Sequence, residues 1–153
     1  GEGPFSPERA GTLPVGQLIT ACFSGKYSED QIRRLVVGEG GFVGYLGTNS
    51  AKEVEEKAQS GDKKAQLIQE ALFYQVSKLI GEMAVVLEGK VDAILLTGGL
   101  AYNDELEKYI KKKAGFIAPI FTYPGEDELQ ALAMNALRVA RNEVEVKEYQ
   151  KTN

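Results

Sequence analysis

Two apolar runs separated by one helical stretch constrain the fold of this chain more than any other feature. Residues 91–96 (VDAILL) and 116–123 predict two strands, and residues 104–113 between them predict a helix. Strands joined by a crossover helix pair in parallel, and the connection is right-handed. The predicted fold class is therefore α/β. The loops that follow the two strands are expected side by side at one edge of the sheet, where open α/β folds bind ligands.

Helices dominate the rest of the prediction. Apolar spacing and capping residues place them at residues 14–23, 28–35, 50–59, 62–87 and 126–141. Ser28 and Ser50 are expected N-caps, the latter with Glu53 in a capping box, Asp62 opens the longest helix, and Asn103 is expected to cap the helix at residues 104–113. The last of these is expected to bury one apolar face, formed by Leu129, Leu132, Ala133, Ala136, Leu137 and Ala140. The glycine-rich residues 38–47 are predicted as a loop or an irregular extended segment, and residues 142–153 as a charged tail.

The predicted sheet has too few strands to surround the apolar run at residues 91–96, which should lie at its centre. The unbroken apolar character of residues 91–96 indicates burial on both faces. Independent stability usually needs three or more strands, and only two are evident. Part of the sheet is therefore expected to be missing from this chain. The first residue is Gly1 rather than Met, which fits a piece of a longer protein.

Composition excludes several classes of function. The 153 residues suit one domain and can bury about 70% of the unfolded surface. A net charge of −4 argues against a nucleic-acid partner, and no apolar stretch approaches the roughly 20 residues of a membrane span. The single Cys22 is expected to be a buried, inert thiol in a reducing, cytoplasmic compartment. Without histidine there is no Ser-His or Cys-His nucleophile pair.

Three positions carry candidate chemistry, each with a structural alternative. The Thr97-Gly98-Gly99 turn allows close backbone approach to a ligand, or it is simply a tight strand-to-helix turn. Glu126 is a candidate metal-linked carboxylate, or an acid that favours a helix start. Arg9 offers a fork of donors to carboxylate or phosphate, or it is a solvated surface charge.

Four segments together resemble the butyrate kinases in order and spacing. They read GEGPFSPERAGTLPVGQL, GGFVGYLGTNSAKEVE, DAILLTGGLAYN and FIAPIFTYPGEDELQALAMNALRV. The resemblance spans nearly all of this chain but only about the carboxyl-terminal half of the family's length. It implies the carboxyl-terminal, ribonuclease H-like domain of the superfamily that contains acetate kinase, sugar kinases, heat-shock chaperone ATPases and actin. The amino-terminal domain of the same protein is then an expected partner.

The resemblance also implies roles for single residues. Arg9 is the expected catalytic residue, facing the acyl substrate and the transferred phosphoryl group. Glu126 is the expected magnesium residue. The expected nucleotide-binding residues are Thr97, Gly98, Gly99, Tyr102 and Asn103 in one loop and Gly47, Thr48 and Asn49 in another. Ser50 and Lys52 stand where related acyl kinases carry aspartate and arginine, so the nucleotide contacts of that second segment are open.

The implied activity is reversible phosphoryl transfer between Mg-ATP and butanoate, and this chain alone is expected to be inactive. Two alternatives stay open at this stage. One is a non-catalytic nucleotide-binding module of the actin or chaperone type, and the other is a helical α/β domain without a ligand. The sequence gives no oligomeric state, so a homo-oligomer is also left open.

Overall fold

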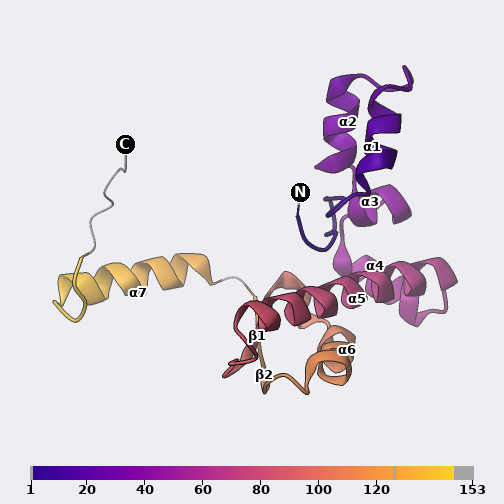
Figure 1. Cartoon of the computed structure of the whole chain (residues 1–153). Helices are drawn as coiled ribbons and strands as arrows, with labels where there is room; N and C mark the ends of the chain where they lie inside the picture. Colours follow the sequence, from indigo (N-terminus) through magenta and orange to yellow (C-terminus); the bar gives the residue numbers. More distant parts are fainter. Residues whose placement is uncertain (1, 126, 147–153) are drawn as a thin grey trace.

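The structure is a computed structural model that describes residues 2–125 and 127–146. The chain order of elements is α1 (Val15–Cys22), α2 (Glu29–Val36), α3 (Gly41–Leu46), α4 (Ala51–Gln59), α5 (Lys63–Val86), β1 (Ile94–Gly98), a 3-10 turn η1 (Gly99–Tyr102), α6 (Asp104–Ala114), β2 (Ile120–Pro124) and α7 (Glu128–Ala140). Figure 1 shows α1 and α2 side by side above a body formed by α4, α5, α6 and the two strands.

The two strands pair in parallel, and α6 connects them, as the sequence predicts. The register runs from Ile94 opposite Ile120 to Gly98 opposite Pro124. Both strands begin three or four residues later than their apolar runs. Within the described residues the sheet has these two strands only.

One face of this small sheet is packed and the other is open. Ile94 and Leu96 of β1 are each 9% exposed, whereas Leu95 between them is 61% exposed. The buried side belongs to a core that includes Leu72 of α5 and Ile110 of α6. The prediction that residues 91–96 are buried on both faces is therefore wrong for the described chain. Alternate side chains of a strand point to opposite faces, and in the described residues only one of these faces has helices packed on it.

Local capping chemistry explains where the helices begin. The Ser28 side chain accepts a hydrogen bond from the Gln31 amide, and the Gln31 side-chain oxygen accepts one from the Ser28 amide, which completes a capping box before α2. Asp62 caps α5 by accepting from the amides of Lys64 and Ala65. These helices agree with the prediction to within one or two residues.

The glycine-rich segment contains a short helix, α3, so its prediction as a loop or extended segment is wrong. The first-turn amides of α3 find acceptors in a loop far away in the sequence. Phe42 donates to the Ser6 carbonyl at 3.3 Å and Val43 donates to the Pro7 carbonyl at 3.0 Å. A helix leaves its first amides without internal partners, so these tertiary bonds stabilise a helix that propensity alone would not predict.

Glycine at position 41 permits this contact. Gly41 has φ +54°, and a Cβ built there would lie 1.7 Å from the Ser6 carbonyl oxygen. Its neighbour Gly40 would place a Cβ 2.5 Å from the Ala10 amide nitrogen. Both positions therefore exclude a side chain, because the backbone of residues 6–10 packs directly against them.

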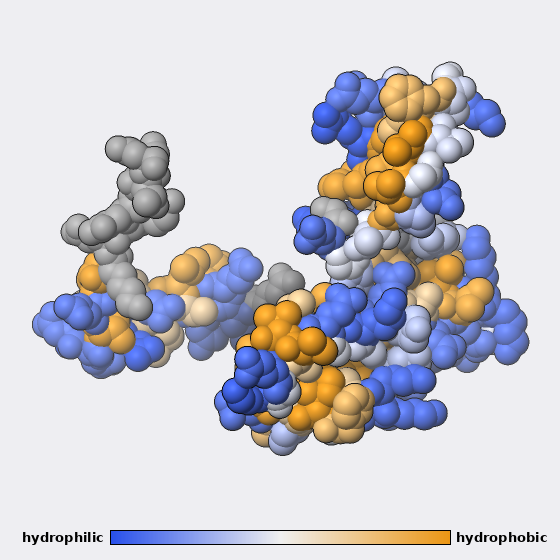
Figure 2. Space-filling model, viewed as in Figure 1, coloured by the Kyte–Doolittle hydropathy of each residue, from blue (hydrophilic) through white to orange (hydrophobic). Residues whose placement is uncertain are grey.

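Helix α7 lies apart from the body (Figure 1). The prediction that it buries an apolar face is wrong here, because none of its residues is buried. Leu129 is 84% exposed and Leu132 is 66% exposed. Figure 2 shows hydrophobic surface on α7, on the α1–α2 pair and on the body around the strands. An amphipathic helix buries its stripe only against a partner, and no described element supplies one.

The surface area agrees with this open arrangement. The chain exposes 11475 Å², whereas a compact monomer of 16.7 kDa exposes about 7600 Å². The expected burial of about 70% of the unfolded surface is therefore not reached. In the part of the chain that the structure describes, no helix is both long and apolar enough to cross a membrane.

Gly41→Ala should destabilise the protein strongly. The added Cβ would clash with the Ser6 carbonyl, and the alanine would have to adopt a positive φ. We therefore expect the free energy of unfolding to fall by about 3 kcal/mol or more. Gly81→Ala is the matched control, because a Cβ there meets no atom within 4 Å and a helix gains about 1 kcal/mol from this exchange. Thermal unfolding of the two variants checks the prediction. A Gly41→Ala variant as stable as the parent protein would contradict the backbone contact.

Candidate functional site

The loops after β1 and β2 meet at one edge of the sheet, as the topology predicts. Gly98 and Gly125 exchange two backbone hydrogen bonds, each with an N···O distance of 3.1 Å. Gly98 has φ +83° and Gly125 has φ +103°, so both positions favour glycine. Glu126, the predicted metal residue, follows Gly125 and lies outside the described residues.

Asn103 is a buried polar residue whose side-chain oxygen is hydrogen-bonded within the described chain and whose side-chain nitrogen is not. Its side-chain oxygen accepts from the amides of Glu105 at 2.9 Å and Leu106 at 3.1 Å, and so caps α6 as predicted. The side chain is only 8% exposed. Because the capping atom must accept hydrogen bonds, it is Oδ1, and the other atom of the side-chain amide is Nδ2. The Nδ2 group makes no hydrogen bond with another described residue, so this donor is available to a ligand.

Asn103 is one of the residues that line a cavity of about 360 Å³. Four of its lining residues come from the turn after β1, and three come from the first turns of α4. The seven are Gly99, Leu100, Tyr102, Asn103, Ala51, Lys52 and Glu55. The structure thus brings most of the predicted nucleotide loop, though not Thr97 or Gly98, to one cavity. It adds a second wall from α4, two to six residues after the predicted segment 47–49.

The two charged residues that line the cavity, Lys52 and Glu55, both lie on α4. Lys52 and Glu55 are three residues apart and share a helix face. Burial raises the pKa of the Glu55 carboxyl, and the neighbouring acids Asp104 and Glu105 raise it further. Glu55 was not among the residues predicted from the sequence. Its helical spacing from Lys52 is the signal that would have pointed to it.

Segment 47–49 does not line the cavity, and the side chains of Thr48 and Asn49 are engaged within the chain. Gly47 ends α3 in a left-handed conformation with φ +74°. The Thr48 hydroxyl donates to the Glu53 carboxylate at 2.6 Å, and the Asn49 amide donates to the Glu8 carboxylate at 2.6 Å. A direct nucleotide contact from Thr48 or Asn49 therefore stays a prediction.

The capping box predicted at Ser50 forms only in part. The Ser50 hydroxyl accepts from the Glu53 amide at 3.2 Å. The Glu53 carboxylate instead accepts from Thr48 and from the Lys57 ammonium, the latter at 2.6 Å. The Lys57 ammonium lowers the pKa of the Glu53 carboxyl, and the Thr48 hydroxyl lowers it further.

Arg9 lies in a loop whose backbone is fixed and whose side chain is free. Its carbonyl accepts from the Ser6 amide at 3.0 Å, its own amide donates to the Ser6 hydroxyl at 3.1 Å, and it forms an isolated bridge with Val37. The residue is exposed. Among the described residues its guanidinium has no hydrogen-bond or ion-pair partner, so all five N–H donors are available to a ligand.

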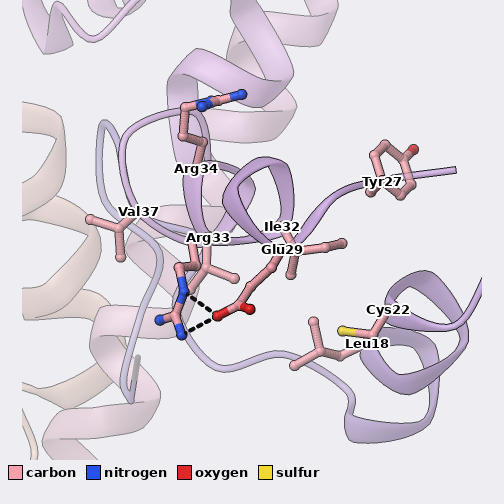
Figure 3. Close-up of a pocket in the computed structure, with 9 residues that line it drawn as sticks. Leu18, Cys22, Tyr27, Glu29, Ile32, Arg33, Arg34 and Val37 are labelled. Carbon is pink, nitrogen blue, oxygen red and sulfur yellow. Dashed lines mark hydrogen bonds and ion pairs between the residues drawn. The ribbon is translucent and has the colours of Figure 1, made fainter. Parts of the chain in front are cut away.

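A second, larger cavity contains none of the predicted site residues. It measures about 670 Å³ and lies between α1 and α2 (Figure 3). Arg33 and Glu29 form an ion pair of 2.6 Å on its wall. Cys22 also lines it and is exposed, so the prediction of a buried thiol is wrong. The α1 helix contacts α2 on one side only, which leaves its last turn open.

Magnesium would have to be held by few protein groups. In residues 2–125 and 127–146 there is no cluster of three or more acidic, histidine or cysteine side chains suited to a metal ion. Mg²⁺ commonly uses one or two carboxylates together with water and substrate phosphates, so a single acid near bound phosphates suffices.

This fold and this site define a member of a kinase family. Residues 6–115 match the acetokinase family, and the chain belongs to that family. The prediction of a helix-rich α/β fold is confirmed, with a small parallel sheet in the described residues. The chain is 56% identical over 149 residues to a probable butyrate kinase of Clostridium botulinum (strain Alaska E43 / Type E3). It is 56% identical over the same length to a probable butyrate kinase of strain Eklund 17B / Type B.

Solved structures give the same fold at lower identity. A crystal structure of Porphyromonas gingivalis acetate kinase matches 89% of this chain with a TM-score of 0.76 and 19% identity. A crystal structure of Entamoeba histolytica acetate kinase matches 88% with a TM-score of 0.75 and 15% identity. The chain spans 42% of the length of each of the two probable butyrate kinases and 41% and 43% of the two crystallised chains.

Glu53→Gln should remove a contribution to folding stability that depends on pH. The folded-state pKa of Glu53 lies below its ordinary 4.5, so the ionised group stabilises the fold above that value. The contribution is lost as the pH falls through the lowered pKa. The melting temperatures of the parent protein and the variant should therefore differ at neutral pH and converge as the pH falls through the lowered pKa of Glu53. Glu70→Gln on α5 controls for charge, and a difference that does not change with pH would contradict the prediction.

Proposed function

We propose that this chain supplies the nucleotide-binding part of a butyrate kinase, which transfers a phosphoryl group between ATP and butanoate. The observation that carries the proposal is the cavity of about 360 Å³ between the turn after β1 and the start of α4. Asn103 lines this cavity, and its Nδ2 donor has no hydrogen-bond partner among the described residues, so it is available to a ligand. The 56% identity to probable butyrate kinases supports the choice of reaction.

The chemistry divides among few groups. A butanoate oxygen attacks the γ-phosphorus, the bond from that phosphorus to the bridging oxygen breaks, and ADP leaves with the electron pair. Such a transfer needs positioning and charge neutralisation rather than a histidine base. Arg9 would neutralise the equatorial phosphoryl oxygens with its fork of donors. The adenosine would occupy the cavity, where the Asn103 Nδ2 group donates to it.

Magnesium is the cofactor that this reaction implies. Glu126 would hold it, with water and phosphate oxygens as the remaining ligands. The ion supplies charge neutralisation across the β- and γ-phosphates when it is bound.

The remaining partner would be the amino-terminal domain of the same protein. The relatives are longer than this chain, which covers 42% of their length. The exposed apolar stripe of α7 and the open face of β1 and β2 are the surfaces that such a domain would cover. We also place the protein in the cytoplasm, because its one cysteine has no disulfide partner in the 153 residues.

Acyl-phosphate trapping tests the reaction. The complete gene product that contains this chain should form a hydroxamate from butanoate, Mg-ATP and hydroxylamine. Arg9→Lys keeps one charge but loses the planar fork, so kcat should fall about 100-fold or more, as for arginines that stabilise phosphoryl transfer. Nucleotide binding without hydroxamate in the parent protein would instead indicate a non-catalytic nucleotide-binding module.

Asn103→Asp separates capping from ligand binding. Aspartate keeps the oxygen that caps α6, so the melting temperature should stay within a few degrees of the parent value. The variant loses the Nδ2 donor and adds a negative charge to the cavity, so we expect the Kd for ATP to rise about tenfold or more. Isothermal titration measures the affinity. Unchanged affinity together with unchanged stability would remove Asn103 from the nucleotide site.

A further inference from the structure

One hydrogen bond joins the loop of Arg9 to the helix that lines the cavity. The Asn49 Nδ2 group donates to Glu8 Oε1 at 2.6 Å across 41 residues of sequence. The acceptor is a carboxylate, so the bond is of the stronger, charge-assisted kind. Asn49 directly precedes Ser50, the N-cap of α4. The bond therefore connects the residue before Arg9 with the start of α4.

The backbone of Glu8 is held from a second side. Its carbonyl accepts from the amides of Gly38 at 2.8 Å and Gly40 at 3.1 Å. The Glu8 side chain thus spans from a fixed backbone to Asn49. A displacement of Asn49 would act on the peptide unit next to Arg9, whose own amide and carbonyl are bonded to Ser6.

We propose that Asn49 is a positioning residue for Arg9 rather than a nucleotide ligand. Through Glu8 it sets where the Arg9 loop lies relative to α4, and α4 forms one wall of the cavity for adenosine. This inference rests on the proposed kinase function. It follows from the need to align a charged group with the phosphoryl oxygens, since a displacement of about 1 Å can cost about 100-fold in rate.

Three variants of the complete gene product test the bond. Asn49→Asp puts a second carboxylate opposite Glu8 and removes the donor, so kcat should fall about tenfold or more while the KM for ATP stays within about twofold. Glu8→Gln keeps an acceptor and should retain activity within about threefold. The double variant Glu8→Gln/Asn49→Asp restores the bond with donor and acceptor exchanged, so it should recover most of the lost kcat. Gln17→Glu adds one negative charge on α1 and should change neither constant.

A second readout does not depend on catalysis. Hydrogen exchange at the amides of Ser6, Arg9 and Ala10 should quicken severalfold in Asn49→Asp and return toward the parent rate in the double variant. Exchange in α6 should not change.

The outcomes separate the two proposals. If Asn49→Asp raises the KM for ATP and the double variant does not rescue it, Asn49 is a nucleotide ligand and the inference is wrong. An unchanged kcat also overturns it. If the parent protein forms no acyl phosphate but exchange shows the rescue, the kinase function fails and the link between Asn49 and the Arg9 loop stands.

Discussion

The parallel pairing of β1 with β2 determines where the rest of the site is built. Directly after the last parallel pair, an isolated antiparallel bridge joins Gly98 and Gly125 by two hydrogen bonds of 3.1 Å each. Because this bridge joins the ends of both strands, the turn into α6 and the turn into α7 start from one point. The turn after β1 then places Asn103 against the first turns of α4. A side chain at either glycine would have to adopt a strained conformation, and at Gly125 a Cβ would lie 2.8 Å from the Tyr102 hydroxyl.

The second fixed point is the contact between the Arg9 loop and the glycine-rich segment. Here backbone meets backbone, because Gly40 and Gly41 leave no side chain between the two segments. The amides of α3 and of Gly38 and Gly40 satisfy carbonyls that the Arg9 loop cannot pair internally. The loop is therefore held by at least four hydrogen bonds from residues 38–43, whereas the guanidinium itself has no partner in the described chain. A fixed backbone combined with a free side chain suits a group that must be positioned precisely and still bind a ligand.

Features with local causes were predictable from the sequence, and features with distant causes were not. Ser28, Asp62 and Asn103 cap their helices as expected, because a cap involves residues two or three positions away. Helix α3 was missed because its stabilising acceptors lie more than 30 residues upstream. The errors at Leu95, Cys22 and Leu129 share one origin: apolar periodicity indicates which face seeks a partner, but burial also requires that the partner be present. Glu55 was overlooked for a different reason: its spacing from Lys52 is visible in the sequence, but it points to a site only once the tertiary fold brings α4 to the turn after β1.

Placement rather than proton transfer is the common theme of the described site. The chain has no histidine, so the groups proposed to act here are an arginine and groups that bind through oxygen or amide hydrogen bonds. Their efficiency then depends on how rigidly the two glycine contacts and α4 hold them. Helix α4 touches both ends of this arrangement, since its lining residues face Asn103 and the residue before its cap is bonded to Glu8. Helix α4 thus joins the cavity to the loop of Arg9 in one short element, which is the arrangement that the positioning role inferred for Asn49 requires.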